Sequence, residues 1–438
     1  MEVRLFLALE DTSFMKIVII GGGFTGLTAA LRLLQKGHKV VLIERESSLG
    51  GLAGGFKKKP WLWTLEKSYH HWFTNDDEAL GLAKELGQEI LIKRPKTSVL
   101  VGGNISSFDS PVSVLTFPYL PLIDRIRLGM AVLFLKIVQD PSIFKKAKAL
   151  SWIRRWMGKK ATELIWEPLF IGKFNEFKDD VALTWFWARI KKRTSSLAYP
   201  AGGFKTFAEE IAAEINKLGG EVLLETEVLK VRSNKSCFIQ TSKGTLKADQ
   251  VIFTTPTSVF TRVVSGLPAR YTKRVSSVPH LCALNLILVL NKPFMGDNYW
   301  LNITDKSYPF LVLAEHTNFM HTRDYGNQHI VYIGNYLPAN HPFLKMSAGD
   351  LLKVFDPYLK EINGKYRKSI VEYQKFVLAS AQPVMGTNYT QLIPKHKTPI
   401  KNVYIANLDM VYPWDRGTNY AIKMGEDIAN LIQNNFKT

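Results

Sequence analysis

The sequence predicts an α/β fold with a parallel sheet, and three observations near its start support this prediction. An unbroken apolar run at residues 17–20 is typical of a strand that is buried on both faces. A glycine turn follows directly, and apolar residues then recur at helical spacing until Gly37, where a left-handed cap would end the helix. A second apolar run at residues 40–43 completes a unit of strand, turn, helix and strand.

The turn has the G-x-G-x-x-G frame of a Rossmann-like dinucleotide-binding unit. Its glycines allow a tight turn, the approach of a pyrophosphate and close packing of helix on strand. The helix N-terminus offers unpaired N–H groups to phosphates. Glu44 ends the second strand, at the position where an acidic residue of such units accepts hydrogen bonds from the hydroxyl groups of the adenosine ribose. A purely structural glycine turn is the alternative, but the agreement of these features favours binding. The residues that we predict to bind the dinucleotide here are Gly21, Gly23, Phe24, Thr25, Gly26, Glu44 and Arg45.

A second glycine pair, Gly50 and Gly51, follows this unit. A domain that binds only a nicotinamide dinucleotide does not need glycines at this place. FAD does, because more backbone must pass beside its pyrophosphate and ribityl chain. The sequence therefore favours FAD, with a flexible surface loop as the alternative.

The charge of the chain restricts its partners. The 438 residues suffice for about two or three domains. Lys and Arg outnumber Asp and Glu by 57 to 38, which gives a formal net charge of +19. This charge suits acidic substrates and anionic lipid surfaces, whereas nucleic acid fits least because no nucleic-acid-binding motif accompanies it.

Cysteine and histidine residues show no metal-ligand spacing, so we predict no metal site. Cys237 and Cys282 lie in apolar, strand-like surroundings and are expected to be reduced core residues of a cytoplasmic protein. No apolar run approaches the ~20 residues of a membrane-spanning helix. We expect Met15 to be the natural start, with residues 1–14 a loose tail or a mis-assigned start, because the first strand begins directly after it.

The region between Pro141 and Thr162 combines basic residues with two tryptophans that lie one helical turn apart, Trp152 and Trp156. A solvated basic face over a tryptophan-containing core is one interpretation. Peripheral contact with an anionic membrane is the other, because an apolar helix is expected nearby at residues 128–138. The basic residues are Lys145, Lys146, Lys148, Arg154, Arg155, Lys159 and Lys160.

The later part of the chain is predicted to return to the first sheet. A helical stripe at residues 207–218 leads to short strands that end at residues 251–253, as in a second βαβ-like block. A last strand at residues 403–406 precedes a helix that begins near Gly417. The N–H groups at the start of this helix would face a ligand.

These segments together resemble the two-domain FAD-dependent oxidoreductases of the amine oxidase superfamily, which includes relatives of protoporphyrinogen oxidase and phytoene desaturase. The resemblance extends over nearly the whole chain. It is carried by Gly21 to Gly26 with Glu44, Gly50-Gly51, Tyr199 to Gly203, Thr226 to Val228, Asp249 to Pro256 and Val403 to Gly425.

The resemblance implies a discontinuous FAD-binding domain of the Rossmann-like GR2 type. This domain would consist of residues 15–75, 199–265 and 395–438. An inserted α+β substrate or cap domain would consist of residues 76–198 and 266–394.

The resemblance also implies how non-covalent FAD would be held. The backbone of Val228 would meet the adenine, and Gly50 and Gly51 would flank the pyrophosphate. The helix after Gly417 would face the flavin pyrimidine edge, where reduced flavin carries negative charge that a helix N-terminus stabilises. No cysteine near this motif could form a thioether. The cofactor-binding residues implied outside the first unit are Gly50, Gly51, Val228, Thr255, Asp409, Gly417, Thr418, Asn419 and Tyr420.

The expected activity is transfer of a hydride from a substrate C–H bond to flavin N5. His70, His71 and Tyr420 are the candidate catalytic residues, and at most one histidine of the pair is expected to face the flavin. The substrate is expected to be a small molecule that is acidic or lipophilic. Further candidate cavity residues are Tyr69, Trp414, Arg416 and Asn419.

Two other classes of function stay open at this point. One is a flavin-dependent mutase or isomerase of a nucleotide sugar, with no net redox change. The other is a non-catalytic protein of the same fold that contacts a membrane peripherally.

Overall fold

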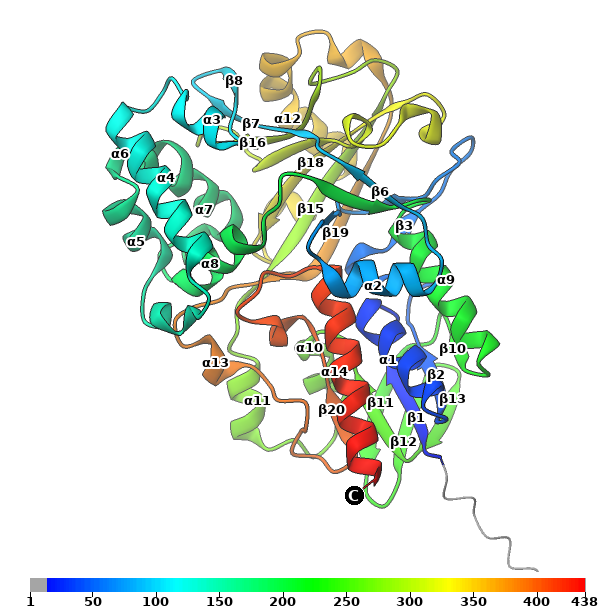
Figure 1. Ribbon diagram of the computed structural model, residues 1–438. Helices are drawn as coiled ribbons and strands as arrows, with labels where there is room; N and C mark the ends of the chain where they lie inside the picture. The colour runs from blue at the N-terminus through cyan, green and yellow to red at the C-terminus, as the bar shows by residue number, and fades with distance from the viewer. Residues whose placement is uncertain (1–13, 438) are drawn as a thin grey trace, which may run out of the picture.

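Five parallel strands form the sheet that the first unit of the chain predicts (Figure 1). The structure is a computed structural model that describes residues 14–437, so residues 1–13 of the predicted tail lie outside the described residues. The strand order is β10-β2-β1-β14-β20, and every neighbouring pair is parallel. The strands are β1 (Lys16–Ile20), β2 (Lys39–Ile43), β10 (Glu221–Leu223), β14 (Gln250–Phe253) and β20 (Val403–Ile405).

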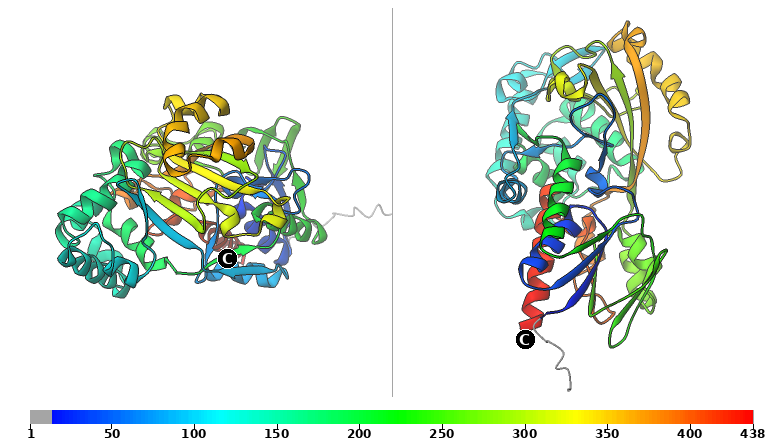
Figure 2. Two further views of the ribbon diagram at one scale, coloured as in Figure 1. Left: turned by 90° about the horizontal axis from the view of Figure 1, so that it is seen from above. Right: turned by 90° about the vertical axis from the view of Figure 1, so that its right-hand side faces the viewer.

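The surroundings of β1 explain its unbroken apolar run. Ile17 and Ile19 pack against helices on one face of the sheet. Val18 and Ile20 pack on the other face against a three-stranded antiparallel sheet. Figure 2 shows the sheet between these two layers. The layers consist of α1 (Phe24–Gln35), α9 (Phe204–Lys217) and α14 (Thr418–Lys437), and of β11 (Val228–Ser233), β12 (Cys237–Thr241) and β13 (Gly244–Ala248).

The predicted second βαβ-like block is correct in part. Its strands β10 and β14 join the parallel sheet, as the sequence predicts. The three strands between them do not join that sheet. They pair antiparallel with each other because the short links between β11, β12 and β13 leave room only for hairpin connections.

A seven-stranded sheet forms the upper part of the molecule in Figure 1, in the order β19-β15-β18-β17-β16-β7-β8. All neighbouring pairs are antiparallel except β16 with β7. Leu284 and Leu286 of β15 face α12 (Ala348–Ile362), whereas Ile287 faces the core of the first sheet. The strands are β7 (Lys96–Val101), β8 (Asn104–Ser107), β15 (His280–Leu290), β16 (Asn298–Ile303), β17 (Val312–Glu315), β18 (His329–Leu337) and β19 (Ile370–Pro383).

The helices between β8 and β9 form a helical lobe, at the upper left in Figure 1. The inner faces of these helices share an apolar core that includes Leu128, Leu135, Ile153 and Trp187. The helices are α3 (Pro111–Leu115), α4 (Leu122–Ile137), α5 (Ala149–Trp156), α6 (Lys159–Ala161), α7 (Glu167–Phe174) and α8 (Leu183–Lys192).

Shorter elements connect these parts. Strand β3 pairs with β4, and β9 pairs with both β5 and β6. These elements are β3 (Gly55–Phe56), β4 (Leu65–Glu66), β5 (Trp72–Phe73), β6 (Ile90–Lys93), β9 (Leu197–Pro200), α2 (Asp77–Glu85), α10 (Thr257–Val263), α11 (Ala269–Val275) and α13 (Tyr389–Leu392).

Glu66 is a buried carboxyl group at the point where β4, β9 and α9 meet. Its two oxygens accept hydrogen bonds from the Tyr199 hydroxyl at 2.9 and 2.8 Å, and Oε1 also accepts from the Phe204 N–H at 2.8 Å. Burial raises the pKa of Glu66 to about 7, because these donors offset only part of the cost of removing the charge from water.

The stability of the protein should therefore depend on pH through Glu66. Between its ordinary pKa of 4.5 and about 7, the folded state holds a proton that the unfolded state releases. The free energy of unfolding consequently falls as the pH rises through this window. The free energy of unfolding of Glu66→Gln, minus that of the wild type, should therefore rise by about 2.5 kcal/mol between about pH 5 and about pH 8.

Urea unfolding of both FAD-loaded proteins at several pH values measures this difference. Any pH-independent effect of the amide cancels, because only the change with pH is compared. The exposed Glu221→Gln variant is the control, and its stability should run parallel to that of the wild type. Parallel curves for Glu66→Gln would contradict the prediction.

Candidate functional site

The two glycine clusters predicted from the sequence lie in direct backbone contact. The Gly50 N–H donates to the Gly22 carbonyl oxygen at 2.9 Å, and Gly23 and Gly50 form a parallel bridge. A Cβ atom on Gly51 would lie 3.1 Å from the Gly23 Cα, and Gly51 has a positive φ of 57°. A side chain at Gly51 would press against the Gly23 backbone and would be strained at this φ, so glycine at this position favours the contact of the two turns.

The turn between β1 and α1 closes tightly at Gly26. A Cβ atom there would lie 1.9 Å from the Gly21 carbonyl oxygen. Helix α1 begins at Phe24, no side chain caps its N-terminus, and its first turn contains no acid. The N–H groups of this end are therefore free of a capping carboxylate that would compete with a phosphate.

Glu44 lies between the first glycine turn and the β10–β11 connection. Its Oε2 accepts from the Gly22 N–H at 2.7 Å, and its carbonyl oxygen accepts from the Thr226 N–H at 2.9 Å. Val228, two residues after Thr226, is buried. The structure thus brings the predicted ribose and adenine residues together, whereas Arg45 is exposed and pairs with Glu46 at 2.7 Å.

Thr255 presents an unpartnered hydroxyl beside the glycine turn. Its Oγ1 is buried, and among the described residues it has no hydrogen-bond partner. A Cβ atom on Gly21 would lie 3.2 Å from the Thr255 Cγ2. An unpaired buried hydroxyl is costly, so this atom fits a place where a ligand supplies the partner. With the apposed glycines and the uncapped helix, these residues fit the dinucleotide part of FAD.

Asp409 is fully engaged by protein groups. Its Oδ2 accepts from the Thr257 hydroxyl at 2.5 Å, and its Oδ1 lies 2.6 Å from His280 Nε2. Burial lowers the pKa of His280, but the Asp409 carboxylate outweighs this effect and raises it. The adjacent Asn407 donates to the Thr255 carbonyl oxygen at 3.0 Å. A direct contact of Asp409 with FAD stays a prediction.

Helix α14 begins at Thr418, directly after Gly417, as the sequence predicts. Its first side chains hold the helix in place. Thr418 Oγ1 accepts from Trp72 Nε1 at 2.6 Å, and Asn419 Oδ1 accepts from the Ala79 N–H at 2.9 Å. Tyr420 stacks on Trp414, with ring centroids 5.8 Å apart. The backbone N–H groups of this first turn are thus the groups that a flavin could meet.

His70 and His71 have different neighbours. The Nδ1–H of His70 donates to the Ser68 carbonyl oxygen at 2.7 Å, whereas His71 Nδ1 lies 3.2 Å from the Tyr299 hydroxyl. Burial lowers the pKa of His70 to about 4 and that of His71 to about 3. Both imidazoles are therefore neutral at neutral pH. Their catalytic roles and that of Tyr420 stay predictions.

Four charged side chains meet where the helical lobe, the seven-stranded sheet and the start of α14 come together. We call Lys173, Arg189, Asp415 and Arg416 the charged cluster. The Asp415 carboxylate lies 2.5 Å from Arg189 Nη1 and 3.9 Å from Lys173 Nζ. It also accepts a hydrogen bond from Trp185 Nε1 at 3.0 Å.

Tyr336 of β18 links the cations of this cluster. Lys173 Nζ lies 4.7 Å from the centre of its ring, and the Arg416 guanidinium lies 5.0 Å from it. Arg416 also donates to the Tyr336 hydroxyl and, at 3.0 Å, to Gln382 Oε1. Tyr69 belongs to the same surroundings, because burial and then Tyr336 raise its pKa well above its usual range.

Burial decides the protonation of Lys173. It lowers the pKa of the amine well below its usual value, Asp415 opposes this effect, and Arg189 and Arg416 add to it. Burial acts in the opposite direction on Asp415, but the three cations lower the pKa of its carboxyl below its usual range. The carboxylate is therefore charged, and the cluster carries more positive than negative charge.

Sequence reasoning identified only Arg416 of this cluster. Lys173 is the single charged residue in the run from Leu169 to Phe174, and this break in an apolar helix could have identified it. Nothing comparable marks Tyr336 of β18 or Gln382 of β19, which meet the cluster only through tertiary packing.

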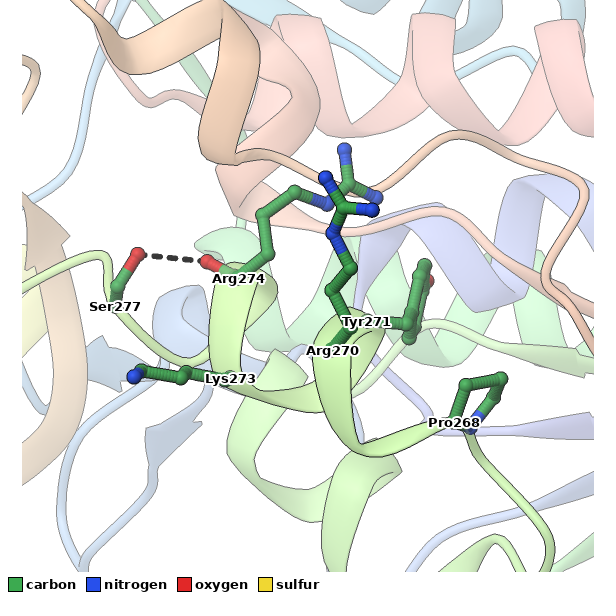
Figure 3. Close-up of a pocket in the computed structure, with 6 residues that line it drawn as sticks. All are labelled: Pro268, Arg270, Tyr271, Lys273, Arg274 and Ser277. Carbon is green, nitrogen blue, oxygen red and sulfur yellow. Dashed lines mark hydrogen bonds between the residues drawn. The ribbon is translucent and has the colours of Figure 1, made fainter.

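A surface pocket at α11 is separate from these groups. Figure 3 shows the guanidinium groups of Arg270 and Arg274 pointing in the same direction beside it. The lining residues are Pro268, Arg270, Tyr271, Lys273, Arg274 and Ser277. None of them is a predicted FAD residue or a member of the charged cluster, so this pocket lies outside the site.

The close packing at Gly26 gives a first test of the cofactor site. We expect Gly26→Ala to lose most of its bound FAD, because the added methyl group would displace the Gly21 carbonyl and open the turn. The FAD-to-protein ratio from absorbance measures the effect, and circular dichroism reports the fold. Gly81→Ala is the matched control, because Gly81 also lies within a helix but has open space at its Cβ. Full FAD content in Gly26→Ala would contradict this assignment.

The unpartnered hydroxyl of Thr255 gives a second test. We expect Thr255→Val to raise the Kd for FAD about five- to tenfold, the effect of one lost hydrogen bond, without destabilising the FAD-free protein. Fluorescence titration with FAD measures the Kd. Thr28→Val is the matched control, because Thr28 Oγ1 is also buried without a partner among the described residues. Equal Kd values for both variants would show that Thr255 does not contact FAD.

Comparisons with known proteins agree with this geometry. The profile of the family described as flavin containing amine oxidoreductase matches residues 24–432. The chain is 25% identical over 287 residues to 15-cis-phytoene desaturase, chloroplastic/chromoplastic, of Capsicum annuum. That match covers 57% of this chain and 48% of the desaturase. The chain thus spans about half the length of the curated relatives that it first matches.

Solved structures show the same fold at low sequence identity. Reduced UDP-galactopyranose mutase is 15% identical, with a TM-score of 0.77 and a match over 96% of both chains. Cyclohexylamine oxidase from Brevibacterium oxydans is 13% identical, with a TM-score of 0.74 over 97% of this chain and all of that chain. These likenesses and the parallel sheet confirm the predicted fold class. Because the family profile matches nearly the whole chain, the protein belongs to the family of flavin containing amine oxidoreductases.

Proposed function

We propose that this enzyme oxidises a C–H bond of a small-molecule substrate that carries an anionic group, and that the charged cluster holds this group. FAD, when bound, supplies the acceptor for the hydride at N5. The single observation that carries the proposal is the excess of positive charge in the cluster. The Arg189 and Arg416 guanidinium groups and the Lys173 amine surround one carboxylate, that of Asp415.

Buried cations without enough counter-charge are costly, which supports an anionic ligand here. Lys173 is only 8% exposed, and its pKa is held well below its usual value. A carboxylate or phosphate beside Lys173 and Arg416 would favour the protonated amine and balance the charge. Arginine is well suited to this role because its guanidinium binds such groups in a bidentate manner.

The position of the cluster also supports the proposal. Asp415 and Arg416 directly precede Gly417, and the helix that begins there is expected to face the flavin. Aromatic side chains of Trp185, Tyr69 and Tyr336 surround the cluster and limit the access of water. An anionic group bound by Arg416 would thus orient the rest of the substrate towards the expected flavin position.

His70 is the candidate that could take up a proton. Because a carbonyl oxygen can only accept, the hydrogen bond to Ser68 places the imidazole proton on Nδ1. Nε2 then keeps its lone pair. The lowered pKa keeps this nitrogen unprotonated at neutral pH, as a proton acceptor must be.

A nucleotide-sugar mutase is the second candidate, and the same cations favour it because a diphosphate carries suitable charge. The fold likeness to reduced UDP-galactopyranose mutase is consistent with it. The two candidates differ in electron balance. An oxidoreductase should lose its flavin absorbance when it is mixed anaerobically with its substrate. A mutase should convert substrate only after its flavin has been reduced, and without net consumption of electrons.

The anion-binding role is tested with pyrophosphate as the probe. We expect pyrophosphate to perturb the absorbance spectrum of the yellow wild-type enzyme, and we expect Arg416→Gln and Lys173→Met each to weaken its binding at least roughly tenfold. Lys178→Met is the matched control, because Lys178 lies near α7 but pairs with Glu167 and Asp179 outside the cluster. Equal pyrophosphate binding in all variants would overturn the proposal.

Substrate selection provides an independent check. In an anaerobic screen, acids should reduce the flavin faster than their methyl esters in the wild type, and this preference should disappear in Arg416→Gln.

Replacement of His70 and His71 separately by Ala then tests the histidines. Unchanged flavin reduction in both variants would reject a role for either.

A further inference from the structure

Helix α4 exposes a continuous apolar face on the outside of the helical lobe. Seven of its large apolar side chains are between 45% and 64% exposed. They are Leu122, Ile123, Ile126, Met130, Leu133, Phe134 and Ile137. Isolated exposed apolar residues are ordinary on a protein surface, but seven on one helix of 16 residues are not.

The arrangement of these residues shows that they form one surface. At about 100° per residue, they all fall within an arc of about 120° around the helix. The opposite side of α4 carries Leu128, Ala131 and Leu135, which are buried in the core of the lobe. Both sides of the helix are therefore apolar, although the protein covers only one of them.

Neighbouring segments extend this surface. Val112 and Leu115 of α3, Ile143 after α4 and Trp156 at the end of α5 are also exposed. Aromatic contacts connect the segments, because Phe134 stacks on Trp152 at 6.3 Å between ring centroids and Trp152 lies 6.4 Å from Trp156. We call the exposed side chains of α3, α4, Ile143 and Trp156 the apolar surface.

The segment that carries the apolar surface is strongly basic. Residues 111–160 contain ten Lys or Arg and two Asp, and one of these acids, Asp124, is buried. Lys148, Arg154 and Lys159 pair with Asp180, Glu167 and Glu163. The other basic residues between Pro141 and Lys160 are exposed and form no ion pair with any described residue. They are Lys145, Lys146, Arg155 and Lys160.

We propose that the apolar surface lies on an anionic lipid bilayer, with its apolar side chains at the acyl boundary and the unpaired basic residues at the headgroups. Basic residues, an exposed tryptophan and a helix with an apolar outer face are typical of interfacial binding. Over residues 14–437, no helix combines the length and apolarity that crossing a membrane requires. The surface therefore rests on the bilayer and does not span it.

The charge pattern argues against a second copy of this chain as the occupant. A symmetric dimer through the apolar surface would bring two copies of the same basic segment together. Such like-charge contacts oppose association, whereas lipid phosphates attract the same residues. Of these two occupants, only an anionic membrane matches both the apolar and the charged part of the surface.

Vesicle flotation of the full-length FAD-loaded protein tests the proposal. We expect the wild type to float with vesicles of phosphatidylglycerol and phosphatidylcholine, and far less with phosphatidylcholine alone. The triple variant Ile123→Gln, Met130→Gln, Ile137→Gln should lower the bound-to-free ratio at least roughly tenfold. The control triple variant Leu62→Gln, Ile92→Gln, Val371→Gln changes comparably exposed residues elsewhere and should float like the wild type.

A charge variant separates the two parts of the surface. Replacing Lys145, Lys146, Arg155 and Lys160 by Gln should lower binding to anionic vesicles at least roughly tenfold. The same change at the exposed Lys235, Lys247, Lys365 and Lys401 should have a much smaller effect. Brominated lipid should also quench the fluorescence of Trp156. The contribution of this residue is the difference in quenching between the wild type and Trp156→Phe.

Three outcomes would overturn the proposal. One is absence of flotation with anionic vesicles, and the second is equal flotation of the α4 variant and its control. The third is a vesicle-independent dimer that the α4 triple variant converts to a monomer, which would make the apolar surface an interface between copies. Flavin absorbance and pyrophosphate binding should stay unchanged in the α4 variant, so this test is independent of the proposed function.

Discussion

The contact between two glycine turns is the constraint on which the site depends. Gly26 lets α1 start against the Gly21 carbonyl, and Gly51 lets the second turn approach Gly23. No side chain larger than a hydrogen atom fits without moving backbone. This packing fixes the N-terminus of α1 beside Glu44 and the Thr255 hydroxyl, and so defines where the pyrophosphate and ribose of FAD are expected.

The C-terminal segment connects this cofactor site to the rest of the molecule. Strand β20 closes the parallel sheet, and α14 packs back against α1. Between them, Asp415 and Arg416 reach side chains of α7, α8, β18 and β19. One short stretch therefore joins the helical lobe, the seven-stranded sheet and the expected flavin position.

Helix α8 has a comparable linking role on the side of the lobe. Trp187 Nε1 donates to the Val138 carbonyl oxygen just after α4, at 3.1 Å, while Arg189 pairs with Asp415. The same helix thus contacts both the element that carries the apolar surface and the charged cluster. The two faces of the lobe serve different environments, one apolar and basic on the outside, the other polar and enclosed.

The sequence by itself determined the first parallel unit, its glycine turns and the start of α14, because these depend on local backbone geometry and short periodicities. Only the tertiary structure decided that β11 to β13 form a separate sheet and that Lys173, Arg189 and Tyr336 meet Arg416. These residues are far apart in the chain, and a lone lysine or tyrosine carries no local signal of its partner. The same holds for α4, whose apolar periodicity predicts a helix but not which side is left uncovered.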